Sequence, residues 1–384
     1  VRFAVWAPHA QQVSVVGDFN HWDADANPME RSSCGNGIWV MHIAGLQEGD
    51  IYKYAITTAS GERILKSDPY AFWSEVRPNT ASKLTKLHYT WRDKKWMDSR
   101  SAYDSYRKPM LTYEVHLGSW RRGEDGEMLS YRDIAPQLVD YVKQMNYTHI
   151  ELMPLCEYPF DGSWGYQGTG YFSATSRYGS PEDFMYLVDL CHRNGIGVIL
   201  DWVPGGFCKD AHGLGNFVGH KLYEEKEHPN WGTYKFNLGK GEVRTFLISN
   251  ALYWLDQYHA DGLRMDGVSS MLYMNFGIDD PRQKRFNEKG TEEDFVSINP
   301  GAIISGAYFG DKISPLSDTT VLASSVTHTP LFSHIRYMML TTIPSMVITL
   351  IIFTIAGFTH TSNASGQIAE FAASLNESFN ISLW

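Results

Sequence analysis

Two charged side chains near the end of one apolar run could support glycoside chemistry. In the run ADGLRMDG, Arg264 and Asp266 are two residues apart, so a strand would place both side chains on the same face. A guanidinium beside a carboxylate favours the ionised form and orients it. An ionised, oriented carboxylate can act as the nucleophile in glycoside cleavage or transfer. The alternative is that Asp266 caps a following helix and that Arg264 pairs with it structurally.

Further candidates follow two other segments of the sequence. Asp201 ends the apolar run GIGVILDWVP, and the segment GSWGYQ places Trp164 and Tyr166 among glycines, where flat rings could stack on sugar faces. Each also has an ordinary structural interpretation, as a turn or helix-cap aspartate and as rings buried by a tight turn. We predict that Tyr166, Asp201, Arg264 and Asp266 lie around one pocket.

Short strands alternating with helices must position these residues. From Met110, the apolar runs MLTYEVHL, THIELMPL, GIGVILDWVP and ADGLRMDG alternate with helical patterns near 131–146, 181–194 and 243–258. This alternation predicts parallel strands joined by helical crossovers. Four such units make the first half of a (β/α)₈ barrel, at residues 96–298, with its active site at the carboxyl ends of the strands.

The regions on either side differ from this pattern. Residues 1–95 contain short alternating strands separated by turns, which predicts an all-β sandwich. In the C-terminal tail, residues 299–384, the stretch 337–358 carries no charge. At 1.5 Å per residue that stretch could cross a hydrocarbon core of about 30 Å, so we predict a transmembrane helix there. The fold class expected is multidomain β plus α/β.

Charge and cysteine usage exclude several classes of protein. Lys and Arg number 33 against 43 Asp and Glu, and the resulting charge of -10 argues against a nucleic acid partner. The four cysteines form neither a CxxC pair nor a zinc-ligand spacing, so we expect buried, reduced thiols and a cytoplasmic protein. Neither a metal nor a cofactor is expected, since two carboxyl groups suffice for glycoside chemistry.

Taken together and in order, the motifs resemble those of one enzyme family. WAPHAQQVSVVGDFNHW resembles the N-terminal sandwich of glycogen and starch branching enzymes of the α-amylase superfamily, and the later blocks, including DGLRMDGVSSMLY, resemble their barrel. The resemblance covers residues 1–298. It implies a retaining enzyme that cuts α-1,4-glucan chains, such as glycogen, starch or amylose, and forms α-1,6 branches.

The resemblance also implies roles for individual residues. Asp266 is then the nucleophile and Arg264 its partner, while Asp201 fixes the geometry of the pocket. Tyr166 stacks under the sugar at the cleavage point, and Trp164 beside it is a further substrate-binding candidate.

Two departures from the family pattern affect catalysis. Five residues after the strand-end aspartate, where the family has a histidine that binds the sugar, this sequence has Gly206. The general-acid glutamate and the His-Asp pair of later barrel strands have no counterpart after Asp266. We therefore predict a chain that is inactive or nearly so. A glucan-binding protein without catalysis is the alternative.

The tail resembles a different family. Residues 299–358 are similar to a segment of bacterial sodium/proton antiporters. That resemblance implies oxygen donors near an ion path, at Asp311, Ser317, Asp318 and Thr319, whereas an ordinary polar loop is the alternative. One span cannot form the closed helix bundle that ion transport needs. We expect a chimeric chain, with membrane contact only through residues 337–358.

Overall fold

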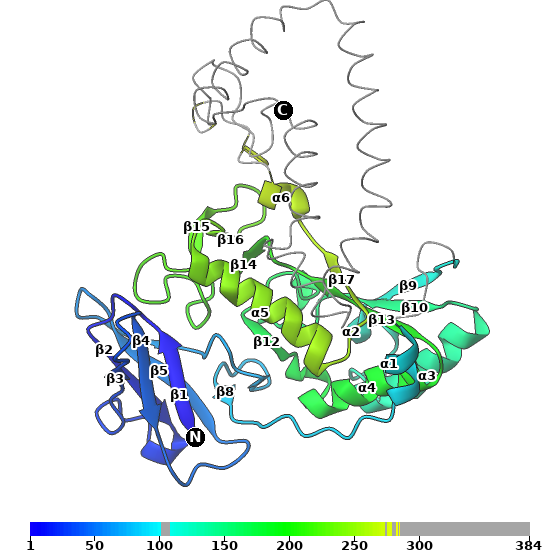
Figure 1. Cartoon of the computed structure of the whole chain (residues 1–384), viewed down its shortest axis with the longest axis horizontal. Helices are drawn as coiled ribbons and strands as arrows, with labels where there is room; N and C mark the ends of the chain where they lie inside the picture. Colours follow the sequence, from blue (N-terminus) through cyan, green and yellow to red (C-terminus); the bar gives the residue numbers. More distant parts are fainter. Residues whose placement is uncertain (101–107, 273–274, 279–281, 283, 285–384) are drawn as a thin grey trace, which may run out of the picture. The chain divides into compact units, whose positions relative to one another are not determined.

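The computed structural model describes residues 1–100, 108–272, 275–278, 282 and 284 (Figure 1). The chain divides into two compact units, Val1–Glu292 and Glu293–Trp384. The predicted span at 337–358 and the antiporter-like donors Asp311, Ser317, Asp318 and Thr319 lie outside the described residues. None of the helices within the described ranges has the length and apolar character needed to cross a membrane.

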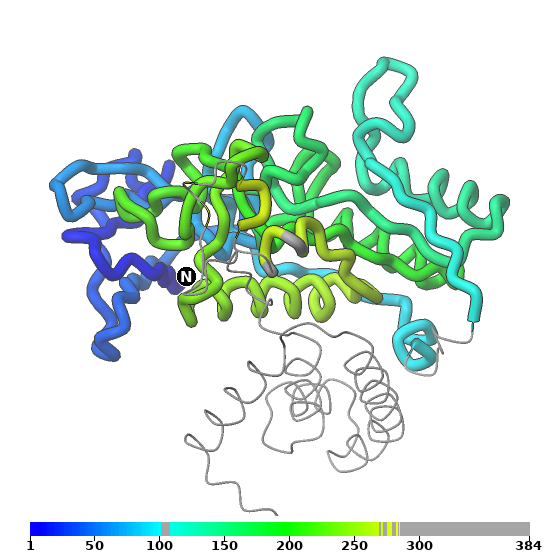
Figure 2. Tube along the Cα trace, turned by 90° about the horizontal axis from the view of Figure 1, so that it is seen from above, coloured from blue at the N-terminus to red at the C-terminus, as the bar shows by residue number. Residues whose placement is uncertain are grey.

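The N-terminal part consists of two antiparallel sheets (blue in Figures 1 and 2). One has the order β1-β4-β3, and the other has the order β2-β5-β8-β7 with β6 paired to β5. Phe3 and Tyr52, from different sheets, meet edge to face with ring centroids 5.0 Å apart, so the inner faces pack as the predicted sandwich requires. The strands are β1 (Arg2–Trp6), β2 (Gln12–Gly17), β3 (Glu30–Arg31), β4 (Ile38–His42), β5 (Ile51–Thr57), β6 (Arg63–Lys66), β7 (Trp73–Ser74) and β8 (Ser82–Lys83).

The second part is built on a parallel sheet with the order β17-β13-β10-β9. Its strands are β9 (Thr112–Val115), β10 (His149–Leu152), β13 (Gly197–Trp202) and β17 (Gly262–Met265). The connections contain α3 (Tyr131–Gln144), α4 (Pro181–Arg193) and α5 (Gly241–Gln257). The predicted strands and helices of this region are confirmed. Within this sheet, β10, β13 and β17 each pair with the sheet strand that precedes them in the chain, as successive β/α units require.

Helix starts follow local capping chemistry. The hydroxyl of Ser130 accepts a hydrogen bond from the backbone N–H of Asp133 at the start of α3. At the start of α4, Ser180 and Asp183 form a reciprocal capping box, and Pro181 occupies the first turn. These caps satisfy N–H groups that have no partner within the helix.

Two smaller sheets interrupt the β/α pattern and were not predicted. The first pairs β11 (Cys156–Glu157) with β12 (Gly170–Ala174), and the second has the order β14-β16-β15. The second sheet contains β14 (Gly206–Phe207), β15 (Glu224–Glu227) and β16 (Tyr234–Phe236). The remaining helical turns are η1 (Asp18–Asn20), α1 (Lys94–Arg100), α2 (Leu117–Trp120), η2 (Asp161–Ser163), η3 (Ser176–Tyr178) and α6 (Val268–Leu272).

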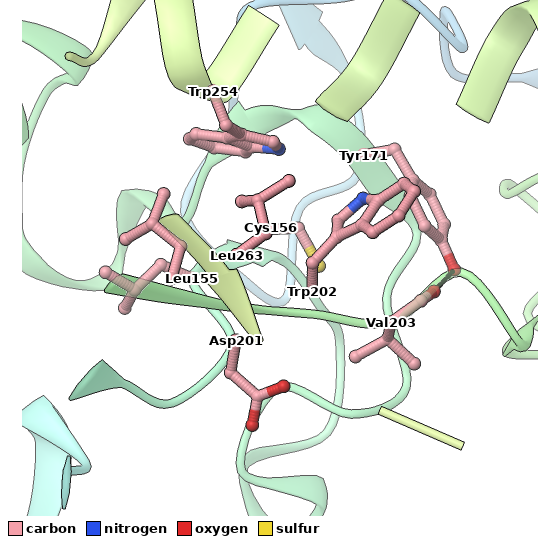
Figure 3. Close-up of a pocket in the computed structure, with 9 residues that line it drawn as sticks. Leu155, Cys156, Tyr171, Asp201, Trp202, Val203, Trp254 and Leu263 are labelled. Atoms are coloured by element: carbon pink, nitrogen blue, oxygen red, sulfur yellow. Dashed lines mark hydrogen bonds between the residues drawn. The ribbon is translucent and has the colours of Figure 1, made fainter. Parts of the chain in front are cut away.

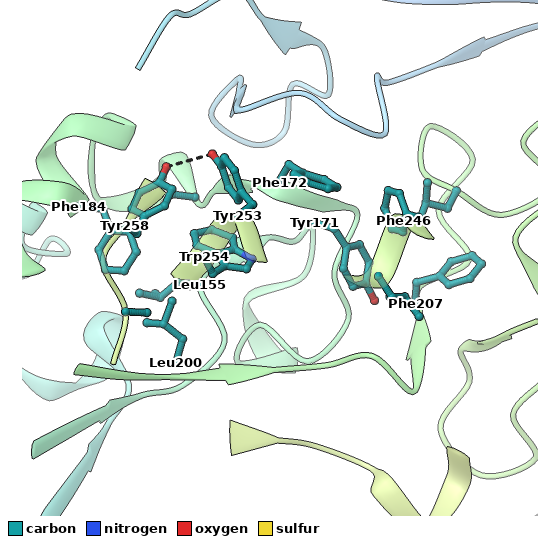
Figure 4. Packing of buried hydrophobic residues seen from close by; sticks show 14 of the residues in the cluster. Leu155, Tyr171, Phe172, Phe184, Leu200, Phe207, Phe246, Tyr253, Trp254 and Tyr258 are labelled. Carbon is teal, nitrogen blue, oxygen red and sulfur yellow. Dashed lines mark hydrogen bonds between the residues drawn. The ribbon is translucent and has the colours of Figure 1, made fainter. Parts of the chain in front are cut away.

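An aromatic core holds α5 against the neighbouring strands (Figure 4). Phe246 and Trp254 of α5 are buried, and Phe246 lies against Tyr171 and Phe172 of β12 with ring centroids 5.8 and 5.5 Å away. Full burial of one such apolar side chain contributes about 1.5–3 kcal/mol. This packing fixes the helix side of the sheet and leaves the opposite face for polar groups.

A buried ionic cluster ties the segment before the sheet to the amino ends of its strands. His192 lies between two carboxylates, with Nδ1 2.8 Å from Asp93 and Nε2 2.9 Å from Asp261. Asp93 also meets Nδ1 of His259 at 2.8 Å. Asp261 directly precedes β17 and accepts a hydrogen bond from the backbone N–H of Val198 in β13. The cluster therefore links the segment around Asp93 to two strands and to α4.

The cysteines depart in part from the expected burial. All four are free thiols; Cys191 and Cys208 are buried, whereas Cys156 is partly exposed and Cys34 is exposed. The expectation of four buried thiols was wrong for Cys34, which lies in the loop between β3 and β4.

Candidate active site

Strand register brings the predicted site residues together. Asp201 near the end of β13 is the direct partner of Arg264 in β17, so both side chains point to the same face of the parallel sheet. Figure 3 shows the Asp201 carboxylate on the side of its strand opposite to Trp254 of α5. One face of the sheet thus packs on the aromatic core, and the other carries the charged groups.

Hydrogen bonds join four of the predicted residues. Nη1 of Arg264 donates to Oδ1 and Oδ2 of Asp201 at 3.0 and 2.9 Å and to Oδ1 of Asp266 at 2.8 Å. The Tyr166 hydroxyl donates to Oδ2 of Asp201 at 2.7 Å. Arg264 therefore bridges the two carboxylates, and both oxygens of Asp201 are occupied. Within the described residues, the Asp201 carboxylate therefore bonds to Tyr166 and Arg264 and does not cap a helix.

Burial and charge act in opposite directions on these groups. Burial raises the pKa of Asp201 above its ordinary value, although hydrogen bonds from Tyr166 and Arg264 oppose this shift. The pKa of Arg264 is raised, because hydrogen bonding and the charges of Asp201 and Asp266 outweigh its desolvation. Burial and the Asp201 carboxylate also raise the pKa of Tyr166. Arg264 and Tyr166 thus stay protonated and act as donors near neutral pH.

The loop between β11 and β12 holds Tyr166 over the strand ends. Its backbone N–H bonds the carbonyl of Ser163 at 3.0 Å. Gly165 has φ +92°, and a β carbon there would lie 2.2 Å from the carbonyl oxygen of Pro154. A side chain at position 165 is excluded by this close approach and disfavoured by the backbone conformation. The close approach of Pro154 therefore explains why position 165 in the segment GSWGYQ is a glycine.

Trp164 lies apart from the hydrogen-bonded cluster. Its side chain is 56% exposed, and its ring centroid is 6.2 Å from that of His116 at the end of β9. An exposed indole beside the strand ends is available for stacking. The structure thus places it at the same edge of the sheet as Tyr166 without a direct bond to the charged residues.

Two acidic residues of this face were missed in the sequence. Glu114 of β9 and Glu151 of β10 are register partners, and their carboxylates and that of Asp201 offer oxygens within 4.8 Å of one another. Burial and the charges of Glu114 and Asp201 raise the pKa of Glu151. The alternation of polar and apolar residues in YEVHL and HIELM was the sequence signal that could have identified Glu114 and Glu151.

Gly206 lies in β14, where a side chain would meet the neighbouring strand. It pairs with Lys235 of β16, and a β carbon would come within 2.5 Å of the Tyr234 carbonyl oxygen. The carbonyl oxygen of Gly206 accepts a 2.6 Å hydrogen bond from the Tyr171 hydroxyl. A histidine at this position requires β14 and β16 to move apart.

We expect Gly206→Ala to lower the free energy of unfolding by about 1–3 kcal/mol, because the added methyl group must displace the Tyr234 backbone. Urea denaturation followed by tryptophan fluorescence measures the loss. Gly241→Ala is the matched control, since a β carbon there meets nothing within 4 Å. Equal stabilities of the two variants would contradict the close approach.

Models of three protein families match parts of the chain. The model of carbohydrate-binding module 48, the isoamylase N-terminal domain, matches residues 1–71. The model of the alpha amylase catalytic domain matches residues 122–234, and that of the Na+/H+ antiporter family matches residues 306–384. Two carbohydrate-related families and one transport family in a single chain agree with the expectation of a chimera.

A solved structure from Salmonella typhimurium, described as a "Putative alpha Amylase", is 24% identical and has a TM-score of 0.58. The match covers 79% of this chain and 45% of that one, and it supports the fold alone.

Much closer in sequence are curated 1,4-alpha-glucan branching enzymes named GlgB. That of Desulfitobacterium hafniense is 58% identical over 276 residues, covering 72% of this chain and 44% of the relative. That of Halothermothrix orenii is 57% identical over 285 residues, covering 73% and 45%. The chain thus spans less than half the length of these relatives. Over its N-terminal 72%, the chain is similar to the GlgB 1,4-alpha-glucan branching enzymes.

Proposed function

We propose that this chain carries the part of a 1,4-α-glucan branching enzyme that holds the donor chain and supplies the nucleophile. The proposal rests mainly on one arrangement, in which Arg264 bridges Asp201 and Asp266 and the Tyr166 hydroxyl donates a hydrogen bond to Asp201. The similarity to GlgB enzymes supplies the substrate class, an α-1,4-glucan.

Three domains are part of this proposal. Residues 1–95 form a carbohydrate-binding-type sandwich that retains the glucan, and residues 96–298 form the first half of a (β/α)₈ barrel. Sequential parallel pairing from β9 to β17 supports the half-barrel, since each new strand is added on the same side. Residues 299–384 form the third, antiporter-like part, which the match at residues 306–384 supports.

The chemical step begins at Asp266. Its carboxylate attacks the anomeric carbon and a glycosyl ester forms with inversion at that carbon, while the leaving oxygen departs with the electron pair of the broken bond and takes a proton from water. In the transfer step the 6-hydroxyl of a second chain attacks the same carbon and loses its proton to water, the Asp266 carboxylate is released, and the second inversion restores the α configuration. Arg264 orients the carboxylate through a charge-assisted hydrogen bond, and Asp201 accepts hydrogen bonds from the same guanidinium.

A substrate that needs no general acid tests this assignment. We expect a 5-fluoro-α-maltotriosyl fluoride to glycosylate Asp266, because fluoride leaves with its electron pair without a proton. Intact-mass spectrometry with peptide mapping should find one glycosyl unit on wild type, none on Asp266→Asn, and an unchanged adduct on the exposed control Asp256→Asn. If the sugar binds but no adduct forms, the binding-only alternative replaces the enzyme.

A further inference from the structure

An indole outside the predicted set lies beside the candidate nucleophile. Trp231, in the loop between β15 and β16, is 37% exposed. A β carbon built on Gly267 would lie 2.9 Å from Cη2 of this ring, so the ring approaches the residue that directly follows Asp266. An exposed aromatic surface is thus present next to the proposed point of attack.

Gly267 makes this approach possible in two ways. Its φ of +67° is a conformation that other residues rarely adopt, and it has no β carbon to strike the indole. Any substitution would both strain the backbone after Asp266 and push the ring away. The glycine at the end of the run ADGLRMDG therefore accommodates Trp231 as well as a turn.

His228 stacks on the indole of Trp231. The two rings stack with centroids 3.7 Å apart and planes only 4° from parallel. Nδ1 of His228 accepts a hydrogen bond from the backbone N–H of Asn230, so the ring proton is on Nε2. Burial, with the charges of Lys235 and Lys226, lowers the pKa of His228 to about 4. The imidazole therefore stays neutral near pH 7, and it covers one face of Trp231.

The buried Nε2 of His228 has no hydrogen-bond partner in the described part of the chain. Such orphaned donors are uncommon in native proteins and lower stability. Packing alone does not explain why this stack keeps an unpartnered Nε2–H group beside an indole that is 37% exposed. His228 covers one face of Trp231, Phe276 meets the indole edge to face with ring centroids 6.2 Å apart, and 37% of Trp231 remains exposed.

We infer that Trp231 is a stacking platform for a glucosyl residue of the α-1,4-glucan adjacent to the one bound at Asp266. This inference rests on the proposed function for its substrate class. The apolar face of a glucose ring packs on an indole, and the His228 stack fixes the ring before the chain arrives. Gly267 places that surface against the turn that carries the nucleophile.

Calorimetric titration of the full chain with maltohexaose tests the platform. We expect about tenfold weaker binding for Trp231→Ala, a loss of roughly 1.4 kcal/mol. Trp231→Phe should lose less, because a smaller flat ring remains, and Gly267→Ala should weaken binding by displacing the indole. Ile248→Ala, an exposed apolar residue on α5, is the matched control and should bind as wild type.

Fluorescence separates direct contact from a structural effect. Maltohexaose should change the tryptophan emission of wild type, and Trp231→Phe should show a smaller change while it keeps part of the affinity and the thermal stability. Wild-type affinity in Trp231→Ala, or an unchanged emission response in Trp231→Phe, overturns the platform alone. A wild-type chain that binds no maltohexaose removes the proposed function together with it.

Discussion

Replacing His192 by alanine lowers the free energy of unfolding by about 3–5 kcal/mol, because it leaves the charges of two buried carboxylates less compensated. His192 is fully buried and contacts Asp93 and Asp261 through its two ring nitrogens. Without it, Asp261 keeps bonds from Trp96 and Val198, and Asp93 keeps only His259 among the ring donors named. Two buried carboxylates then lose the donor they share.

The same cluster makes stability depend on acid pH. Burial alone would raise the pKa of Asp93 and of Asp261, but bonds from His192, with His259 on Asp93 and Trp96 and Val198 on Asp261, lower both. A lowered folded-state pKa contributes stability above the ordinary value of about 3.9, and this stability is lost as pH falls through the folded value. The His192→Ala variant should therefore lose stability less steeply below pH 4.

Urea denaturation at pH 7 and at pH 3.5, followed by circular dichroism, checks both expectations. His42→Ala is the matched control, because His42 is exposed at the end of β4. A loss below 1 kcal/mol at pH 7 would show that the carboxylates find other partners.

The second large effect concerns catalysis. We expect this chain to form branches at least 10²–10⁴-fold more slowly than a chain with the full set of catalytic groups, since a positioned general acid contributes about that factor. Without it the departing sugar leaves as an alkoxide. The family histidine replaced by Gly206 would have donated a further hydrogen bond to the sugar, which is worth on the order of 1–3 kcal/mol in a transition state.

The assay follows the fall in iodine absorbance of amylose. The chain is compared with a version in which the remaining barrel of a GlgB relative replaces residues 299–384 and histidine replaces Gly206. A third version keeps Gly206 and separates the two contributions, because histidine there must also force β14 and β16 apart. Comparable rates in all three would mean that another residue of this chain serves as the acid.

Much of the fold could be predicted because it is encoded locally. Apolar runs and helical periods identified β9, β10, β13, β17 and the three long helices, since burial imposes these patterns along the chain. The pairing of Arg264 with Asp266 was also local, because residues two apart in a strand share a face.

Contacts between distant segments had no such signal. His192 and Asp93 are 99 residues apart, and neither has a neighbour that indicates an ionic cluster. The β14-β16-β15 sheet was missed because β14 and β16 are only two and three residues long and β15 is the charged segment EEKE, which is not an apolar run. Trp231 was not singled out because only the folded loop brings its ring to Gly267.

In the parallel sheet, strands pair only with the sheet strands next to them in chain order, so the sheet can grow while the chain is being synthesised. β10 pairs with β9, β13 with β10, and β17 with β13, so each strand from β10 onward finds one partner already synthesised when it emerges. A ribosome delivers these strands in that same order, at roughly 5–20 residues per second. The sheet can therefore assemble as it emerges, and Asp201 is in place to receive Arg264 when β17 arrives.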